Sequence, residues 1–167
     1  FTAGDNLVIV ATSGGDEYGL YQETVSNSYV KNFTFDGDAE TVAADEKNYF
    51  TVANAPGSTT SWVLGDDTNG YLYSSSSNNL AVTDNQSTWT LEWDDTEEKF
   101  TLMTAGRYLS LRDDLNTDNK YKWRLGGTNT NTGEAFFDIY KLTNDGTIYK
   151  GYTTLITAKT YSITVVN

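Results

Sequence analysis

Five residues with acidic, amide or phenolic side chains lie between positions 66 and 73, in a pattern that suits sugar binding: Asp66, Asp67, Asn69, Tyr71 and Tyr73. The two tyrosines flank Leu72, so on a strand with Leu72 inward both of them point outward. A flat aromatic ring stacks on the C–H face of a sugar, while carboxylate and amide groups bond its hydroxyls. The segment is therefore predicted to bind carbohydrate.

A second patch of the same kind is expected further along the chain. It consists of Tyr108, which precedes Leu109 in the same way, with Asp113 and Asp114. Amphipathic tyrosines also brace the ends of barrels without binding any ligand. That alternative stays open for both patches.

Acidic turns raise the question of metals and catalysis. Residues 113–119 (DDLNTDN) resemble a calcium loop in part but lack the central Gly and terminal Glu of the EF-hand spacing, so Ca²⁺ is only an alternative ligand and no cofactor is predicted. Among 23 acidic residues, some pair will match glycosidase spacing by chance. With no Cys and no His, thiol nucleophiles, disulfides, soft-metal sites and the usual base for a Ser nucleophile are missing. We predict no catalytic residue, no metal site and no enzyme activity.

Charge limits the partners. The 23 acidic residues against 11 basic ones give a net charge of −12, and no Lys/Arg cluster offers the grouped cations that nucleic acid requires. The longest apolar run, residues 7–11, is far shorter than the roughly 20 residues of a membrane span. A glycan or another protein is the expected partner, with neither nucleic acid nor membrane insertion. The abundance of Thr, Ser, Asn, Asp and Tyr with few Lys is typical of secreted and cell-surface bacterial proteins, so an extracellular or cell-surface location is expected.

Short segments that alternate apolar with polar residues predict β-strands. Two sets of four follow each other with a period a little under 40 residues, which indicates a repeated unit. Three further candidates precede these sets and one follows them. The predicted strands lie at 7–11, 18–21, 30–35, 49–52, 61–65, 70–73, 80–83, 89–93, 99–104, 106–114, 121–125 and 136–141. Twelve strands predict an all-β, β-trefoil-like barrel with three pseudo-repeats, whose last strand closes the ring. Another antiparallel β-barrel or a β-sandwich is the alternative.

Alternation also predicts which side chains form the core. The residues expected to point inward are Trp62, Leu64, Leu72, Trp89, Leu91, Trp93, Phe100, Leu102, Leu109, Leu111, Trp123, Leu125, Phe137 and Ile139.

Two of these segments carry a family resemblance. Residues 89–92 (WTLE) and 106–110 (GRYLS) resemble the recurring motifs of fascin-like β-trefoil domains of the secreted bacterial type, and residues 69–73 (NGYLY) and 17–21 (EYGLY) are altered copies. The resemblance covers residues 6–142 as strand order. It implies a trefoil with a binding or scaffolding role and carries over no actin-bundling residue.

The composition changes after residue 142. Residues 1–142 are predicted to form the trefoil-like domain, and residues 143–167 a β-rich extension or the start of a following domain. Two functions are compatible with this organisation. The first is a non-catalytic extracellular binding module, above all for carbohydrate, in a secreted or cell-surface protein. The second is a structural filament subunit of an extracellular assembly, which self-associates by donating residues 147–167 to a neighbour.

Overall fold

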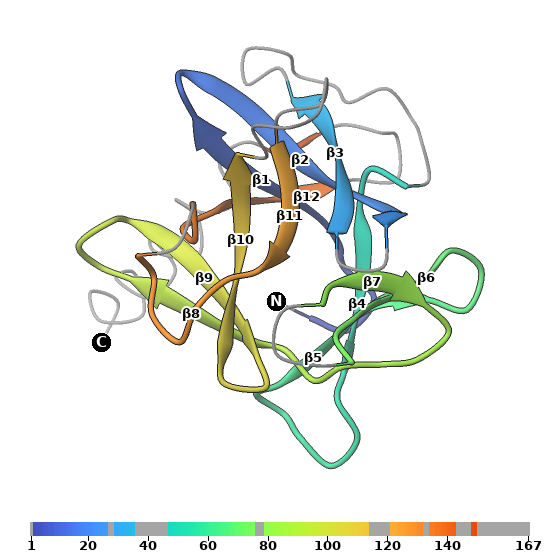
Figure 1. Ribbon diagram of the computed structural model, residues 1–167. Helices are drawn as coiled ribbons and strands as arrows, with labels where there is room; N and C mark the ends of the chain where they lie inside the picture. Colours follow the sequence, from blue (N-terminus) through green and yellow to red (C-terminus); the bar gives the residue numbers. More distant parts are fainter. Residues whose placement is uncertain are drawn as a thin grey trace, which may run out of the picture.

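The computed structural model describes residues 2–26, 29–35, 47–75, 79–113, 121–131, 134–142 and 148–149. These residues form strands and turns and contain no helix, hence no helix that could cross a membrane (Figure 1). The strands are β1 (Asn6–Ser13), β2 (Asp16–Ser26), β3 (Tyr29–Phe35), β4 (Phe50–Asn54), β5 (Trp62–Asp66), β6 (Gly70–Tyr73), β7 (Ala81–Thr83), β8 (Thr90–Asp94), β9 (Lys99–Thr104), β10 (Arg107–Asp113), β11 (Tyr121–Leu125), β12 (Asp138–Leu142) and β13 (Ile148–Tyr149). The predicted all-β class is confirmed.

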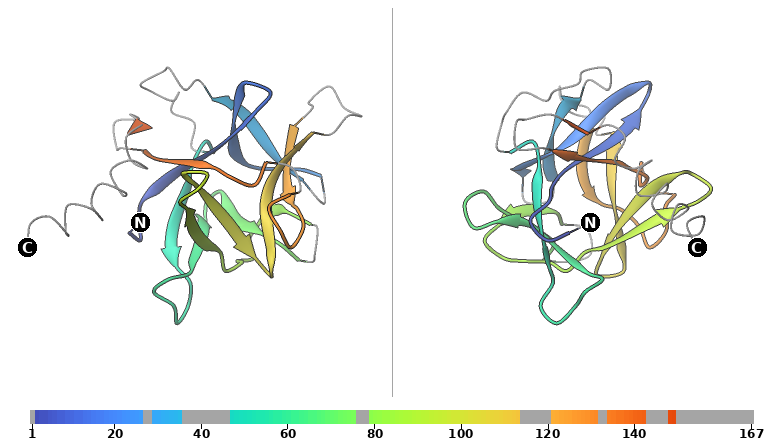
Figure 2. Two further views of the ribbon diagram at one scale, coloured as in Figure 1. Left: turned by 90° about the vertical axis from the view of Figure 1, so that its left-hand side faces the viewer. Right: turned by 180° about the vertical axis from the view of Figure 1, so that it is seen from behind.

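All of these strands pair antiparallel, in the order β7-β6-β5-β4-β1-β2-β3-β11-β10-β9-β8, and the sheet curls into a barrel-like form (Figures 1 and 2). Off this path, β12 runs along β1 from Asn6↔Leu142 to Val10↔Asp138, and β13 pairs with β12 at Leu142↔Ile148. The first twelve strands correspond to the twelve predicted segments. β13 lies in the predicted extension, where residues 143–147 and 150–167 fall outside the described part of the chain.

Two short bridges join strands that are distant in this order. The backbones of Trp62 and Trp89 exchange two hydrogen bonds of 2.8 and 2.7 Å, and those of Phe100 and Phe137 exchange two of 2.9 and 2.8 Å. Trp89 immediately precedes β8 and Phe137 immediately precedes β12. The bridges therefore bring β5 next to β8, and β9 next to β12.

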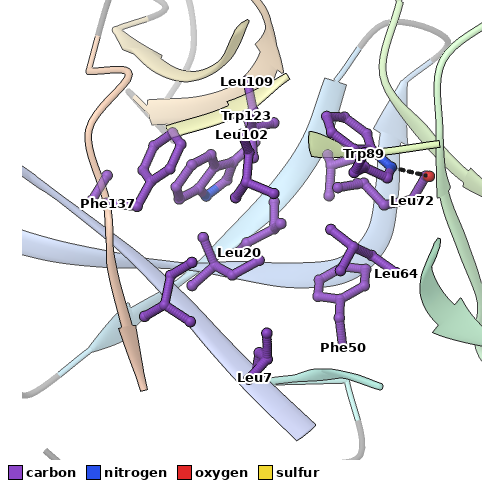
Figure 3. Close-up of a cluster of buried hydrophobic side chains, with 14 of the residues drawn as sticks. Leu7, Leu20, Phe50, Leu64, Leu72, Trp89, Leu102, Leu109, Trp123 and Phe137 are labelled. Carbon is purple, nitrogen blue, oxygen red and sulfur yellow. Dashed lines mark hydrogen bonds between the residues drawn. The ribbon is translucent and has the colours of Figure 1, made fainter. Parts of the chain in front are cut away.

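The main core lies inside the curved sheet and is built largely from the predicted residues (Figure 3). Trp89 and Trp123 are its largest side chains, and both are fully buried. Their indole N–H groups donate to the carbonyl oxygens of Leu72 (3.0 Å) and Gly19 (3.3 Å). Because an unpaired buried donor costs about 1–3 kcal/mol, these bonds let two bulky rings be buried without penalty.

Three predicted core residues lie only at the edge of the core. Trp62, Leu91 and Trp93 are half-buried and pack against the core from outside. Trp93 meets Phe100 edge to face, with ring centroids 5.0 Å apart. The other predicted inward residues are buried, as expected.

A second apolar cluster covers the opposite face of β1. Val8 and Val10 are fully buried there, beneath Phe35 and beside Tyr140. The Phe35 and Tyr140 rings stack, with centroids 5.3 Å apart and planes at 20°. β1 is thus buried on both faces from Leu7 to Ala11.

Removing the Tyr140 hydroxyl should change how stability depends on pH. Burial, with the nearby carboxylates of Asp138 and then Glu17, raises the pKa of Tyr140 to about 12, against about 10 in an unfolded chain. The folded state therefore keeps a proton that the unfolded state loses, so this contribution is complete below about pH 10 and is lost as the pH rises towards about 12. Between about pH 10 and pH 12, the unfolding free energy of Tyr140→Phe should fall less steeply with pH than that of the unchanged protein, as measured by urea denaturation. The difference between the two proteins at neutral pH gives the effect of the substitution on packing alone. An unchanged slope would contradict the assignment.

Candidate functional site

The turn between β5 and β6 is held by Asp66. One carboxylate oxygen, Oδ1, accepts hydrogen bonds from the backbone N–H groups of Thr68 and Asn69, both at 2.8 Å. This is the turn that Asp side chains form with the backbone two and three residues ahead. Asp66, predicted as a ligand contact, therefore has a structural task at this turn.

Two glycines allow the strands on either side of the turn to approach closely. Gly65 and Gly70 have φ values of +129° and +91°. A Cβ on Gly65 would lie 2.3 Å from the Gly70 carbonyl oxygen and 2.7 Å from Tyr71 Cα, both backbone atoms. No side chain fits there, so the glycine sets how Tyr71 leaves the turn.

Tyr71 is tied to groups from two loops. Its hydroxyl donates to Asp67 Oδ1 at 2.7 Å, and the side chain of Gln86, from the loop after β7, hydrogen-bonds the same phenol. The bond to Asp67, then desolvation and the charges of Asp67 and Asp66, raise the pKa of Tyr71, while the Gln86 bond acts in the opposite direction. The predicted Asp67 and Tyr71 thus meet, together with an amide that sequence reasoning did not select.

Tyr73 lies on the same face of β6 as Tyr71, about 7 Å along the strand. Across β7, Tyr71 pairs with Thr83 and Tyr73 pairs with Ala81. Both cross-strand neighbours are small, and both tyrosines are half-buried. The two rings consequently keep exposed surface on one side of the hairpin, with the polar groups of the turn at one end.

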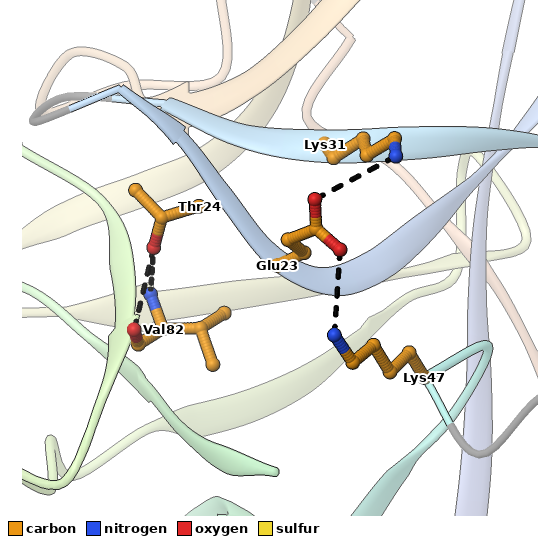
Figure 4. A network of polar contacts seen from close by, with 5 residues as sticks. All are labelled: Glu23, Thr24, Lys31, Lys47 and Val82. Atoms are coloured by element: carbon orange, nitrogen blue, oxygen red, sulfur yellow. Dashed lines mark hydrogen bonds and ion pairs between the residues drawn. The ribbon is translucent and has the colours of Figure 1, made fainter.

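Strand β2 holds this hairpin from the core side. Gln22 Nε2 donates to the Gly70 carbonyl oxygen at 2.6 Å. Thr24 Oγ1 accepts from the Val82 N–H at 2.8 Å and donates to the Val82 carbonyl at 3.3 Å (Figure 4). These contacts join positions 48 and 58 residues apart, and no local pattern in the sequence indicates them.

Ion pairs fix the neighbouring part of β2. Glu23 lies between Lys31 and Lys47, with N···O distances of 3.7 and 3.4 Å (Figure 4). All three side chains are about two-fifths exposed, so each pair contributes little on its own. The two ion pairs join β2 to β3 through Lys31, and to the segment that leads into β4 through Lys47.

The second predicted patch is not assembled in the same way. Tyr108 is half-buried near the start of β10, and its backbone bonds Gly126 and Gly127. Asp113 ends the same strand, where its backbone pairs with Tyr121. About 16 Å of extended chain separates Asp113 from Tyr108. Asp114 lies outside the described residues. The turn before Tyr108 is formed by Ala105 and Gly106 and carries no acid.

Within the described ranges, no group of three or more His, Cys, Asp or Glu side chains could hold a metal ion, and residues 114–120 lie outside those ranges. No protein-family model matches the sequence, and no curated protein matches it.

Replacing Gly65 should disturb the turn far more than replacing another glycine with positive φ. Gly57 has φ +75° and nothing within 4 Å of a built Cβ, so Gly57→Ala should cost only the backbone strain, about 1–2 kcal/mol. Gly65→Ala adds overlap with two backbone atoms and should cost about 3 kcal/mol or more in urea denaturation. Equal losses in the two variants would show that the close approach at Gly65 is unimportant.

Removing the charge of Asp67 should lower the pKa of Tyr71. Asp67→Asn takes away the carboxylate that accepts the hydrogen bond of the phenol, so the pKa of Tyr71 should move down towards the ordinary value of 10. The measurement is an NMR titration of tyrosine Cζ. Asp95→Asn is the matched control, because Asp94 forms the same turn with Thr96 and Glu97 in the β8–β9 hairpin. If the pKa of Tyr71 is the same in Asp67→Asn as in the unchanged protein, the hydrogen bond to Asp67 is not the cause of the raised pKa.

Proposed function

We propose that this protein is a non-catalytic extracellular binding module whose ligand is carbohydrate, bound over the outer face of the β6–β7 hairpin. The observation that carries the proposal is the placing of Tyr71 and Tyr73 side by side, opposite small residues, with Asp67 and Gln86 at one end. Aromatic faces beside amide and carboxylate groups are what sugar recognition requires.

The chemistry of these groups narrows the ligand to neutral sugars. Asp67 holds the Tyr71 phenol by a 2.7 Å bond, so little side-chain entropy is lost when a ligand lands on this ring. Asp66 and Asp67 add negative charge to a chain whose net charge is −12, which disfavours acidic glycans. The absence of His and Cys from the sequence removes the commonest general base and thiol nucleophile, in keeping with binding without catalysis.

We further propose that the barrel is a β-trefoil. The contacts β1–β4, β4–β5, β5–β8, β8–β9, β9–β12 and β12–β1 follow one another as in a closed ring of six strands. The hairpins β2–β3, β6–β7 and β10–β11 stand between successive members of that ring. Leu20, Leu72 and Leu109 are fully buried at matching places in the three hairpins, which supports a threefold repeat. The likeness to fascin-like trefoils stays a prediction.

Glycan binding by single-residue variants tests the function. The whole chain should bind neutral oligosaccharides in a glycan array and in calorimetry, and Tyr71→Ala and Tyr73→Ala should each weaken binding about 10-fold or more, equivalent to about 1.4 kcal/mol. Tyr108→Ala is the matched control and should stay within about 2-fold, since its turn lacks the polar groups. Failure of the whole chain to bind any neutral glycan, or an equal loss from Tyr108→Ala, would refute the proposal.

A further inference from the structure

The outer face of the β10–β11 hairpin carries two arginines in a chain that is otherwise strongly acidic (Figure 1). The core positions of these two strands are Leu109, Leu111, Trp123 and Leu125. Because side chains alternate along a strand, Ser110, Arg112 and Arg124 lie on the opposite, outer face. We call these three residues the arginine face. β10 and β11 together contain four basic residues and one acidic residue, whereas the whole chain has a net charge of −12.

The strand register brings the three residues of the arginine face together. Ser110 pairs directly with Arg124, and Arg112 pairs with the residue two positions before Arg124. Arg112 and Arg124 are therefore diagonal neighbours on one face, with Cβ atoms about 7 Å apart, a separation that long side chains can span. Ser110 is next to both of them, and its side chain is much shorter than theirs.

Arg124 is held in place with most of its donors unused. Its Nε donates to the Leu125 carbonyl oxygen at 3.3 Å, and its Cζ lies 5.5 Å from the centroid of the Tyr29 ring. An aromatic ring contacts the flat face of a guanidinium, so the N–H groups of the two terminal nitrogens still point outward in the guanidinium plane. Arg124 is thus oriented by the fold and can still donate to a ligand.

Ser110 supplies a polar group that the fold does not satisfy. Its side chain is fully buried, and among the described residues Oγ has no hydrogen-bond partner. Buried hydroxyl groups in folded proteins are nearly always bonded. In the same described part of the chain no carboxylate forms an ion pair with Arg112 or Arg124, although the backbone of Glu134 is bonded to that of Leu111 on the neighbouring side of β10.

We propose that the arginine face binds a tetrahedral oxyanion, a sulfate or phosphate group, between Arg112, Arg124 and Ser110. The two guanidinium groups donate charge-assisted hydrogen bonds from two strands, and the Ser110 hydroxyl donates a further one. Donors from three directions suit a tetrahedral anion. Two arginines neutralise too little charge for a nucleic-acid backbone, so the ligand presents a single anionic group. The site is separate from the β6–β7 hairpin and does not rest on glycan binding there.

An NMR titration of the whole chain with sodium sulfate tests the site. Sulfate should produce saturable shifts of the Arg124 Nε–H and Ser110 backbone N–H signals, and sodium chloride at equal ionic strength should not. The backbone N–H signal of Tyr71, on the other hairpin, should stay unchanged.

Two variants assign the binding to the arginine face. Arg112→Gln and Ser110→Ala should each weaken sulfate binding about 10-fold, because each removes one hydrogen bond to the anion. Lys47→Gln is the matched loss of one positive charge and should stay within about 2-fold, since its exposed pair with Glu23 contributes little. Without sulfate, Ser110→Ala should not lower stability in urea denaturation, because its hydroxyl has no partner to lose. A purely structural role of Ser110 would instead lower it.

The source of the anion is found by comparing inorganic sulfate, inorganic phosphate and a sulfated monosaccharide with its unsulfated form as control. Tighter binding of the sulfated sugar than of inorganic sulfate assigns the group to a larger ligand, and equal affinities assign a free ion; both results uphold the site. Shifts that sodium chloride reproduces at equal ionic strength would overturn the proposal. So would sulfate binding that is unchanged in both Arg112→Gln and Ser110→Ala.

Discussion

The structure depends on β1 being buried on both of its faces. Leu7, Ile9 and Ala11 point into the main core, while Val8 and Val10 are buried under the outer rings. The same strand pairs with β12, β2 and β4. At roughly 25 cal/mol per Å² of apolar area removed from water, this burial stabilises the strand to which β2, β4 and β12 are joined. β2 starts from this anchor and continues to Gln22 and Thr24, which hold the β6–β7 hairpin.

Features with a local cause could be predicted from the sequence. Period-two alternation was sufficient to identify Leu72, Leu102 and Trp123 as core, because the face of a strand residue is fixed by its immediate neighbours. Alternation could not show that Val8 and Val10 are buried too, since their cover comes from β3 and β12. Gln22 and Gln86 were missed for the same reason: each owes its role to a partner brought near only by the fold.

The second predicted patch differs from the first in where its acidic residues lie. Tyr71 and Tyr108 each precede a fully buried leucine, Leu72 and Leu109, on β6 and β10. The acids do not follow, because Asp66 and Asp67 precede β6 whereas Asp113 ends β10. On β10, about 16 Å of extended chain separates Tyr108 from Asp113, so an acid at the far end of the strand cannot take the place of Asp67 beside the tyrosine. The Tyr71 hydroxyl has polar partners in Asp67, from the turn before β6, and Gln86, from the loop after β7. The turn before Tyr108 is formed by Ala105 and Gly106 and carries no acid.

Aromatic side chains are found on the outside of the sheet in two different settings. At the β6–β7 hairpin the phenol of Tyr71 is held by Asp67 and the rings stand opposite Ala81 and Thr83, which leaves faces and hydrogen-bonding groups together. On the outside of β3, the half-exposed Phe33 lies on Gly19, and its neighbour Phe35 is buried against Val8 and Val10. A sugar needs hydroxyl partners as well as a ring, so it suits the first surface. The second surface offers mainly apolar contact, and the charged groups beside it already have partners: Lys31 lies over the Tyr21 ring, and Asp138 is ion-paired with Lys99.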